Sequence, residues 1–149
     1  MRNWITLVEN EQKSFYHGSD RDWEIGTVSR GRGADYHKDW SQTDFYSTLE
    51  KYRPSEMIAH SEAVFMCDND DDIDSVGGAT DWVLEMLPLG PVERHDINWS
   101  SAISAAVDDD ADEDAIKEMA MNYWNGIASP DPLWEYLTRE AKVIGSEPY

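Results

Sequence analysis

The sequence predicts an α+β fold, formed by one domain that spans residues 1–149. The length suits a single domain. Hydrophobic residues make up 40% of the chain and there are seven tryptophans, which is enough material for a core and argues against general disorder. Strand-like and helix-like segments follow each other in mixed order without an internal repeat, which is typical of α+β proteins.

The length and spacing of apolar residues locate the expected elements. Short apolar runs of strand length are found at residues 13–18, 63–67, 81–87, 92–95, 133–137 and 141–144. Apolar residues at helical spacing predict a helix over residues 44–53 and two more that begin at the caps Asn98 and Asp112. A further helix is expected over residues 69–76, and the polar, glycine-containing residues 20–40 are expected to form a loop.

The chain is strongly acidic. Asp and Glu total 31 against 12 Lys and Arg, which gives a formal net charge of −19. Such a surface cannot neutralise a run of phosphates, so most direct nucleic-acid binding is excluded, and an anionic membrane surface is disfavoured. We expect a basic protein as partner, with the alternative that the acidic surface only keeps the chain soluble.

Cysteine usage and the length of apolar runs bear on the compartment. Cys67 is the single cysteine, so neither an internal disulfide nor a Cys-rich zinc site is expected. No run has the length of a signal peptide or of a membrane span. The sequence therefore predicts a cytoplasmic protein.

Common cofactor and metal motifs are missing from the sequence. There is no P-loop, no GxSxG and no GxGxxG, and the four histidines do not have zinc-binding spacing. Asp70, Asp72, Asp74 and Asp81 match four positions of a calcium loop, but Ser75 stands where that loop needs glycine. We expect a solvated acidic segment there and no metal site.

Three separated segments carry the candidate site. The first is His17-Gly18-Ser19, where the first strand ends, and the second is the middle strand at residues 63–67. The third is Glu135, a charged residue inside an otherwise apolar strand.

Glu135 allows two arrangements of its strand. It shares a face with Leu133 and Leu137, where a carboxylate is costly unless it has a partner or a function. Alternation alone favours the opposite arrangement, with Trp134 and Tyr136 pointing inward and Glu135 exposed. The pattern by itself leaves both open.

In order, spacing and residue type, these segments resemble the ADP-ribosyltransferase fold, in particular its His–Tyr–Glu class. That class has His-Gly followed by Ser or Thr on an early strand, a middle strand of the form Gly-Ile-Tyr-Phe, and a Glu followed by aliphatic residues on a late strand. Most of the chain also looks like small phage and prophage proteins assigned to this fold. The resemblance implies a split β-sheet core with inserted helices, and NAD as the substrate.

The resemblance implies a role for each matching residue. Glu135 would be the catalytic residue, which accepts a hydrogen bond from the nicotinamide-ribose 2′-hydroxyl and stabilises the positive charge that develops as nicotinamide leaves. His17 would bind the adenosine ribose, and the backbone of Gly18 would contact the nicotinamide amide. Ser19 would add a ribose or amide contact, and Phe65 would form a flat wall beside the nicotinamide ring.

Some residues depart from the family pattern. Phe65 replaces the family's tyrosine and so lacks its hydroxyl, and the following helix lacks a second stacking aromatic, for which Tyr36 or Trp82 could substitute. Leu133 stands where arginine-modifying members have Glu or Gln, which disfavours an arginine acceptor.

Two arginines near the early strand offer a further contact to NAD. Arg30 and Arg32, within the glycine-containing segment, could reach the pyrophosphate, or they could simply be solvated.

Taken together, the resemblance implies a phage-encoded ADP-ribosyltransferase that inactivates a basic host protein, such as a nucleic-acid-binding defence or transcription component, in the host cytoplasm. NAD hydrolysis without a protein acceptor stays open, whereas the charge opposes an RNA 2′-phosphotransferase. The residues also allow a non-catalytic alternative. In it, the acidic clusters at 68–74 and 108–114 mimic a nucleic acid and block a basic groove.

Overall fold

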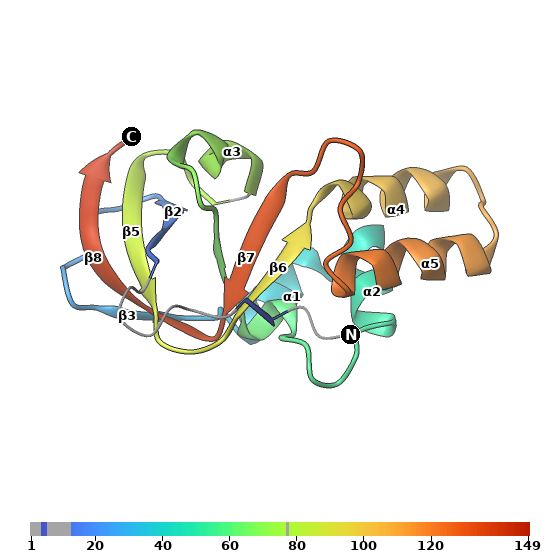
Figure 1. Ribbon diagram of the computed structural model, residues 1–149, viewed down its shortest axis with the longest axis horizontal. Coiled ribbons are helices and arrows are strands. Elements are labelled where there is room, and N and C mark those ends of the chain that lie inside the picture. The colour runs from blue at the N-terminus through green and yellow to red at the C-terminus, as the bar shows by residue number, and fades with distance from the viewer. Residues whose placement is uncertain (1–3, 6–12, 77) are drawn as a thin grey trace.

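Two antiparallel sheets of four strands each form the centre of the molecule, so the predicted α+β class is confirmed (Figure 1). The computed structural model describes residues 4, 5, 13–76 and 78–149. The first sheet has the order β1 (Trp4–Ile5), β6 (Val92–Asp96), β7 (Trp134–Thr138) and β4 (Val64–Met66). The second has the order β2 (Phe15–Ser19), β5 (Trp82–Pro88), β8 (Glu140–Pro148) and β3 (Val28–Arg30).

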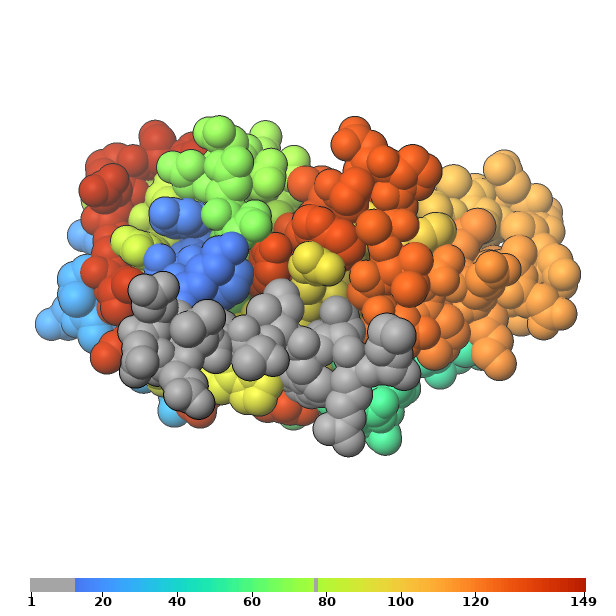
Figure 2. Space-filling model, in the orientation of Figure 1, coloured from blue at the N-terminus to red at the C-terminus, as the bar shows by residue number. Residues whose placement is uncertain are grey.

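The helices are inserted between the strands. They are α1 (Ala34–Trp40), α2 (Asp44–Lys51), α3 (Ile73–Val76), α4 (Asn98–Asp108) and α5 (Glu113–Trp124), with short 3-10 turns η1 (His60–Glu62) and η2 (Asp70–Asp72). Helices α4 and α5 form one end of the molecule, and β8 and β5 lie at the other (Figures 1 and 2). In the described part of the chain, no helix is long and apolar enough to cross a bilayer.

Burial of apolar side chains explains why the strands and the larger helices were predictable. One core fills the space around both sheets and includes Phe15, Met66, Leu84 and Tyr136. A second core joins α2, α4 and α5 through Leu49, Ile103, Ala120, Tyr123 and Trp124, among others. The predicted strands, the helix at 44–53 and the helical character of 69–76 are therefore confirmed, with bounds that differ by a few residues.

Two local predictions are wrong. Residues 20–40 are not one loop, because β3 and α1 lie within them; α1 has no buried residue, so its sequence lacks an apolar face. Asn98 is not a helix cap either: it is the first residue of α4, and its backbone N–H donates to Asp96 Oδ1 at 3.0 Å. Asp112, by contrast, does cap α5 through the Asp114 N–H.

The two sheets meet where β2 touches β4. Tyr16 and Cys67 form a single bridge, with both backbone hydrogen bonds made at 2.8 and 2.9 Å. In a continuing antiparallel ladder, Gly18 would pair next with Phe65. Gly18 instead pairs with Gly78, so the ladder stops after one bridge and the sheets separate.

Candidate functional site

The point where the sheets separate brings the three predicted segments together. Strand β2 carries His17-Gly18-Ser19, β4 carries Phe65, and β7 carries Glu135. Strand β4 lies between the other two, since Cys67, the residue after it, bridges Tyr16 of β2, and Phe65 of β4 pairs with Leu137 of β7. Segments that are 118 residues apart in sequence (17 to 135) are therefore two strand spacings apart, about 10 Å.

The His17 side chain replaces the backbone hydrogen bond that is lost where the β2–β4 ladder stops. Its Nδ1 lies 2.7 Å from the Phe65 carbonyl oxygen, the group that Gly18 would otherwise bind. A carbonyl only accepts, so Nδ1 carries the proton and Nε2 is left as an acceptor. Burial lowers the pKa of His17, which keeps the ring neutral near pH 7.

Gly18 and Ser19 are occupied by contacts within the chain. A Cβ on Gly18 would lie 2.2 Å from the Ala79 carbonyl oxygen and 2.5 Å from Ile73 Cγ2, so packing against this segment requires glycine there. The Ser19 hydroxyl donates to the Arg21 carbonyl at 2.8 Å and accepts from Trp23 Nε1 at 3.1 Å. Both residues thus shape the end of β2.

Glu135 is buried, with 6% of its surface exposed. Its face of β7 also carries Leu137, which is paired with Phe65 on β4, so Glu135 and Phe65 belong to the same side of the sheet. Tyr136 on the other face is buried as well. The strand is therefore covered on both sides, and the arrangement with an exposed Glu135 is wrong.

His17 belongs to the opposite side of its own strand. It shares a face of β2 with Phe15, whose ring lies 4.8 Å from that of Tyr136. Its hydrogen bond to the Phe65 backbone is what connects this side to the strand beside Glu135.

Glu135 has two buried polar neighbours that the motif does not include. The Tyr123 hydroxyl, from α5, donates to Glu135 Oε2 at 2.5 Å. His60 Nε2, from η1, lies 2.8 Å from the same Tyr123 oxygen. Tyr123 and His60 are both almost fully buried.

The charge state of Glu135 is unusual. Burial raises its pKa to about 7, with Asp96 adding to the effect and the Tyr123 hydrogen bond opposing it. Burial lowers the pKa of His60 to about 3, and it raises that of Tyr123, helped by Glu135. At neutral pH His60 and Tyr123 are therefore uncharged, while Glu135 is close to its midpoint.

Aromatic rings surround this polar chain. Tyr36 of α1 stacks on Phe65, with centroids 5.5 Å apart and planes 12° apart. His60 makes edge-to-face contacts with Phe65 and Tyr36, with ring centroids 5.2 Å and 6.1 Å apart. Burial raises the pKa of Tyr36, and the charge of Glu135 is the next largest cause of the rise. Of the two aromatics considered from sequence, Tyr36 is the one that stacks on Phe65.

The loop before α1 is fastened to the segment before β4. A Cβ on Gly31 would lie 2.3 Å from the Glu62 carbonyl carbon, so only glycine fits. The Gly33 N–H donates to the Ser61 carbonyl at 2.7 Å. These two contacts explain why Tyr36 lies over Phe65.

Arg30 and Arg32 lie at the surface. Arg30 forms an ion pair of 2.7 Å with Glu140, and Arg32 forms one with Asp39. Both side chains are more than half exposed, at 66% and 53%.

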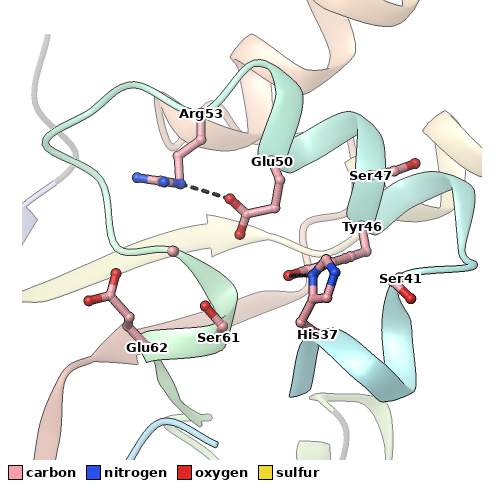
Figure 3. Close-up of a pocket in the computed structure, with 9 residues that line it drawn as sticks. His37, Ser41, Tyr46, Ser47, Glu50, Arg53, Ser61 and Glu62 are labelled. Carbon is pink, nitrogen blue, oxygen red and sulfur yellow. Dashed lines mark hydrogen bonds and ion pairs between the residues drawn. The ribbon is translucent and has the colours of Figure 1, made fainter. Parts of the chain in front are cut away.

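A pocket of about 430 Å³ lies beside this cluster, between α1, α2 and η1 (Figure 3). His37 and Tyr46 point toward one another across part of it, with Nδ1 and the hydroxyl 3.1 Å apart. The Glu50–Arg53 ion pair lies on the α2 side. Neither His17 nor Glu135 lines this pocket.

Sequence reasoning did not identify Tyr123 or His60 as neighbours of Glu135. A buried tyrosine hydroxyl needs a hydrogen-bond partner, which is the signal that could have linked α5 to Glu135. His60 lies just before the middle strand in sequence, but only the fold brings it to Tyr123.

No group of three or more His, Cys, Asp or Glu side chains among the described residues could hold a metal ion. No protein-family model matches the sequence, and neither does any curated protein.

Proposed function

We propose that the protein is an NAD-dependent ADP-ribosyltransferase with an ADP-ribosyltransferase-like split sheet, and that Glu135 is its catalytic residue. The observation that carries the proposal is the meeting of β2, β4 and β7 at the sheet junction, with Glu135 buried on the Phe65 side. A buried carboxylate whose pKa is raised to about 7 is expensive to keep unless it has a function.

The chemical step breaks the bond between the nicotinamide nitrogen and C1′ of the ribose. The bond's electron pair leaves with nicotinamide, and positive charge develops on the ribose. The Glu135 carboxylate accepts a hydrogen bond from the ribose 2′-hydroxyl and stabilises that charge. A nucleophile of the target then bonds to C1′ and releases its proton to solvent.

His17 suits a binding role because of its tautomer. With the proton on Nδ1 and engaged by the Phe65 carbonyl, Nε2 can accept a hydrogen bond from a hydroxyl of the adenosine ribose. The ring is neutral near pH 7, so this acceptor is available under ordinary conditions. Because His17 and Glu135 belong to different sides of their strands, NAD that contacts both would require β2 and β4 to separate beyond the Tyr16–Cys67 bridge.

Access to Glu135 requires part of its cover to move. Helix α1, whose Tyr36 covers Phe65, is a weakly packed part of that cover, since none of its seven residues is buried. Displacement of Tyr36 would uncover one face of Phe65, on which the nicotinamide ring could then stack.

The negative charge favours a basic protein as the acceptor. Opposite charges accelerate the encounter, and salt weakens the effect. We propose a basic host protein that binds nucleic acid, because an added ADP-ribose would block its groove by its bulk and its negative charge.

The test is transfer of label from NAD. Purified protein is incubated with adenylate-labelled NAD and a bacterial lysate, and labelled proteins are separated on a gel. Glu135→Gln should abolish labelling, while Glu118→Gln, an exposed glutamate of α5, should leave it unchanged. Equal labelling by the wild type and Glu135→Gln, or none by either, would overturn the proposal.

The exposed acidic clusters favour a second candidate, a non-catalytic protein that occupies a basic groove. Asp70, Asp71 and Asp74 are exposed in η2 and α3, and Asp108–Asp110 and Asp112 are exposed from the end of α4 to the start of α5. The two clusters lie at separate places on the molecule (Figure 1). In this case Glu135→Gln would keep full binding to a basic partner, and replacing the aspartates of either cluster by asparagine would weaken it.

A further inference from the structure

Glu135 is one end of a chain of hydrogen bonds that runs through the interior. The chain passes from Glu135 Oε2 to the Tyr123 hydroxyl, 2.5 Å away, and from there to His60 Nε2, 2.8 Å away. Its members come from β7, α5 and η1, which are distant in sequence. All three side chains are buried, so bulk solvent does not reach the Tyr123 hydroxyl.

The chemistry of the three groups fixes the direction of the bonds. An ionised carboxylate only accepts, so the Tyr123 hydroxyl donates to Glu135. The Tyr123 oxygen then accepts from His60, which must carry its proton on Nε2. This arrangement leaves His60 Nδ1 as an acceptor, and Nδ1 is buried with no hydrogen-bond partner among the residues that the structure describes.

The unpartnered nitrogen argues against a purely structural His60. A buried polar atom without a partner destabilises the fold, and an apolar side chain of similar size would avoid that cost. The hydrogen bond of His60 to Tyr123 therefore explains the presence of an imidazole here better than packing does.

We propose that Tyr123 and His60 are positioning residues for Glu135, which hold its carboxyl in place and relay its proton. The use of this relay in catalysis rests on the proposed function, but the relay itself does not. A proton that reaches His60 Nδ1 moves the Nε2 proton to Tyr123, and the proton of Tyr123 moves to Glu135. The ring ends with its proton on Nδ1, and all three groups end uncharged.

Other ionisable groups face the chain from the neighbouring elements. They are Tyr36 of α1, Tyr46 and Glu50 of α2, Glu93, His95 and Asp96 of β6, and Arg53 near His60. Asp96 raises the pKa of Glu135 and Glu93 raises that of Tyr123, so both favour the protonated forms. His95 and Arg53 lower the pKa of His60 and so favour its neutral form. Their charges act on the chain from outside, whereas Tyr123 is the group that donates a hydrogen bond to Glu135.

The experiment follows the protons by NMR between pH 5 and pH 9. Glutamate labelled with 13C at the carboxyl reports the ionisation of Glu135, whose signal is assigned by its loss in Glu135→Gln. Histidine labelled with 15N reports the tautomer of His60. We expect His60 to change from the Nε2–H form to the Nδ1–H form as pH falls, with the same midpoint as Glu135. A single tautomer at every pH would overturn the relay.

Substitution of Tyr123 tests the positioning role. Tyr123→Phe removes the donor to the carboxylate, so the Glu135 midpoint should rise by about one pH unit. The matched control is Tyr52→Phe, which removes a tyrosine–glutamate hydrogen bond of 2.7 Å at the surface, to Glu113. It should leave the Glu135 midpoint unchanged, and an equal shift in both variants would contradict the proposal.

His60 is tested by a conservative rescue. The amide nitrogen of His60→Gln can still donate to Tyr123, so the Glu135 midpoint should stay close to that of the wild type. His60→Leu cannot donate, and the midpoint should rise by a few tenths of a pH unit. If leucine and glutamine act alike, His60 does not support Tyr123.

These measurements need no NAD, so they separate the two proposals. If the titrations behave as expected and no ADP-ribose is transferred, the relay stands and the proposed function fails. If transfer depends on Glu135 and Tyr123→Phe leaves the midpoint in place, the relay fails and the proposed function stands.

Discussion

Two buried glutamates on neighbouring strands have very different surroundings. Glu93 on β6 has both oxygens engaged: Oε1 lies 2.8 Å from His95 Nε2, and Oε2 accepts the Ile58 N–H at 2.7 Å. Glu135 on β7 accepts one hydrogen bond from the described residues, that of Tyr123. A carboxylate with its partners in place holds the structure together, whereas one with spare acceptor capacity can bind something else.

The hydrogen-bond partners of Glu93 and Glu135 also differ in chemistry. His95 has an oxygen at each ring nitrogen, the Tyr123 carbonyl and the Glu93 carboxylate, so this pair ties β6 to α5 and to the segment before η1. The partner of Glu135 is a hydroxyl, which can donate or accept. Glu93 is thus a structural residue, and Glu135 is free to change its protonation state.

The largest expected effect is from removing Glu93. Glu93→Ala leaves the Ile58 N–H and His95 without their partner inside the core, and should destabilise the fold by about 3–5 kcal/mol. Urea unfolding at pH 7 measures this. A cost below about 1 kcal/mol would mean that Glu93 is not the structural member of the comparison.

Glu135→Gln should stabilise the fold at high pH, whereas Glu93→Ala destabilises it. Because burial raises the pKa of Glu135 from its usual 4.5 to about 7, the unfolded chain ionises first and stability is lost as pH rises through this window. Glutamine does not ionise, so the variant should exceed the wild type by about 3 kcal/mol at pH 8 and match it near pH 4. Equal stabilities at pH 8 would contradict the raised pKa.

His60 should affect stability in the acid range instead. Its pKa falls from 6.5 to about 3 on folding, so the unfolded chain takes up the proton first and stability is lost as pH falls below 6.5. Between pH 7 and pH 5, the stability difference between the wild type and His60→Leu should change by about 2 kcal/mol in favour of the variant. Thermal unfolding at the two pH values checks it, and a constant difference would count against a neutral buried imidazole.

The smallest effect concerns Tyr36, which lies near Glu135. Tyr36→Ala should admit water and lower the pKa of Glu135 by about half a pH unit, because burial is the main cause of its rise. A carboxyl titration by NMR measures the shift. An unchanged midpoint would mean that α1 does not shield the carboxyl.

The sequence predicted the elements whose apolar residues are buried at a regular period. The helices at 44–51 and 113–124 and the strand at 82–88 are of this kind. Helix α1 was missed because it buries no residue and so has no apolar stripe. Alternation also failed for β7, since a strand covered on both faces has no exposed side to detect.

The candidate site was predictable only in part. Short sequence motifs identified His17, Phe65 and Glu135 as candidates, because each lies on a segment that the sequence predicts to be a strand. The break in the ladder after Tyr16, and the contacts that occupy Gly18 and Ser19, depend on packing between distant segments. For the same reason, no local pattern links Tyr123 and His60 to Glu135.

The most direct test of the central claim is a crystal structure of the Glu135→Gln protein soaked with NAD, in which turnover is prevented. We expect the 2′-hydroxyl of the nicotinamide ribose within hydrogen-bond distance of residue 135, the adenosine ribose at His17 Nε2, and Tyr36 moved from the face of Phe65. NAD bound away from both residues, or an unchanged junction without NAD at saturating concentration, would contradict the account.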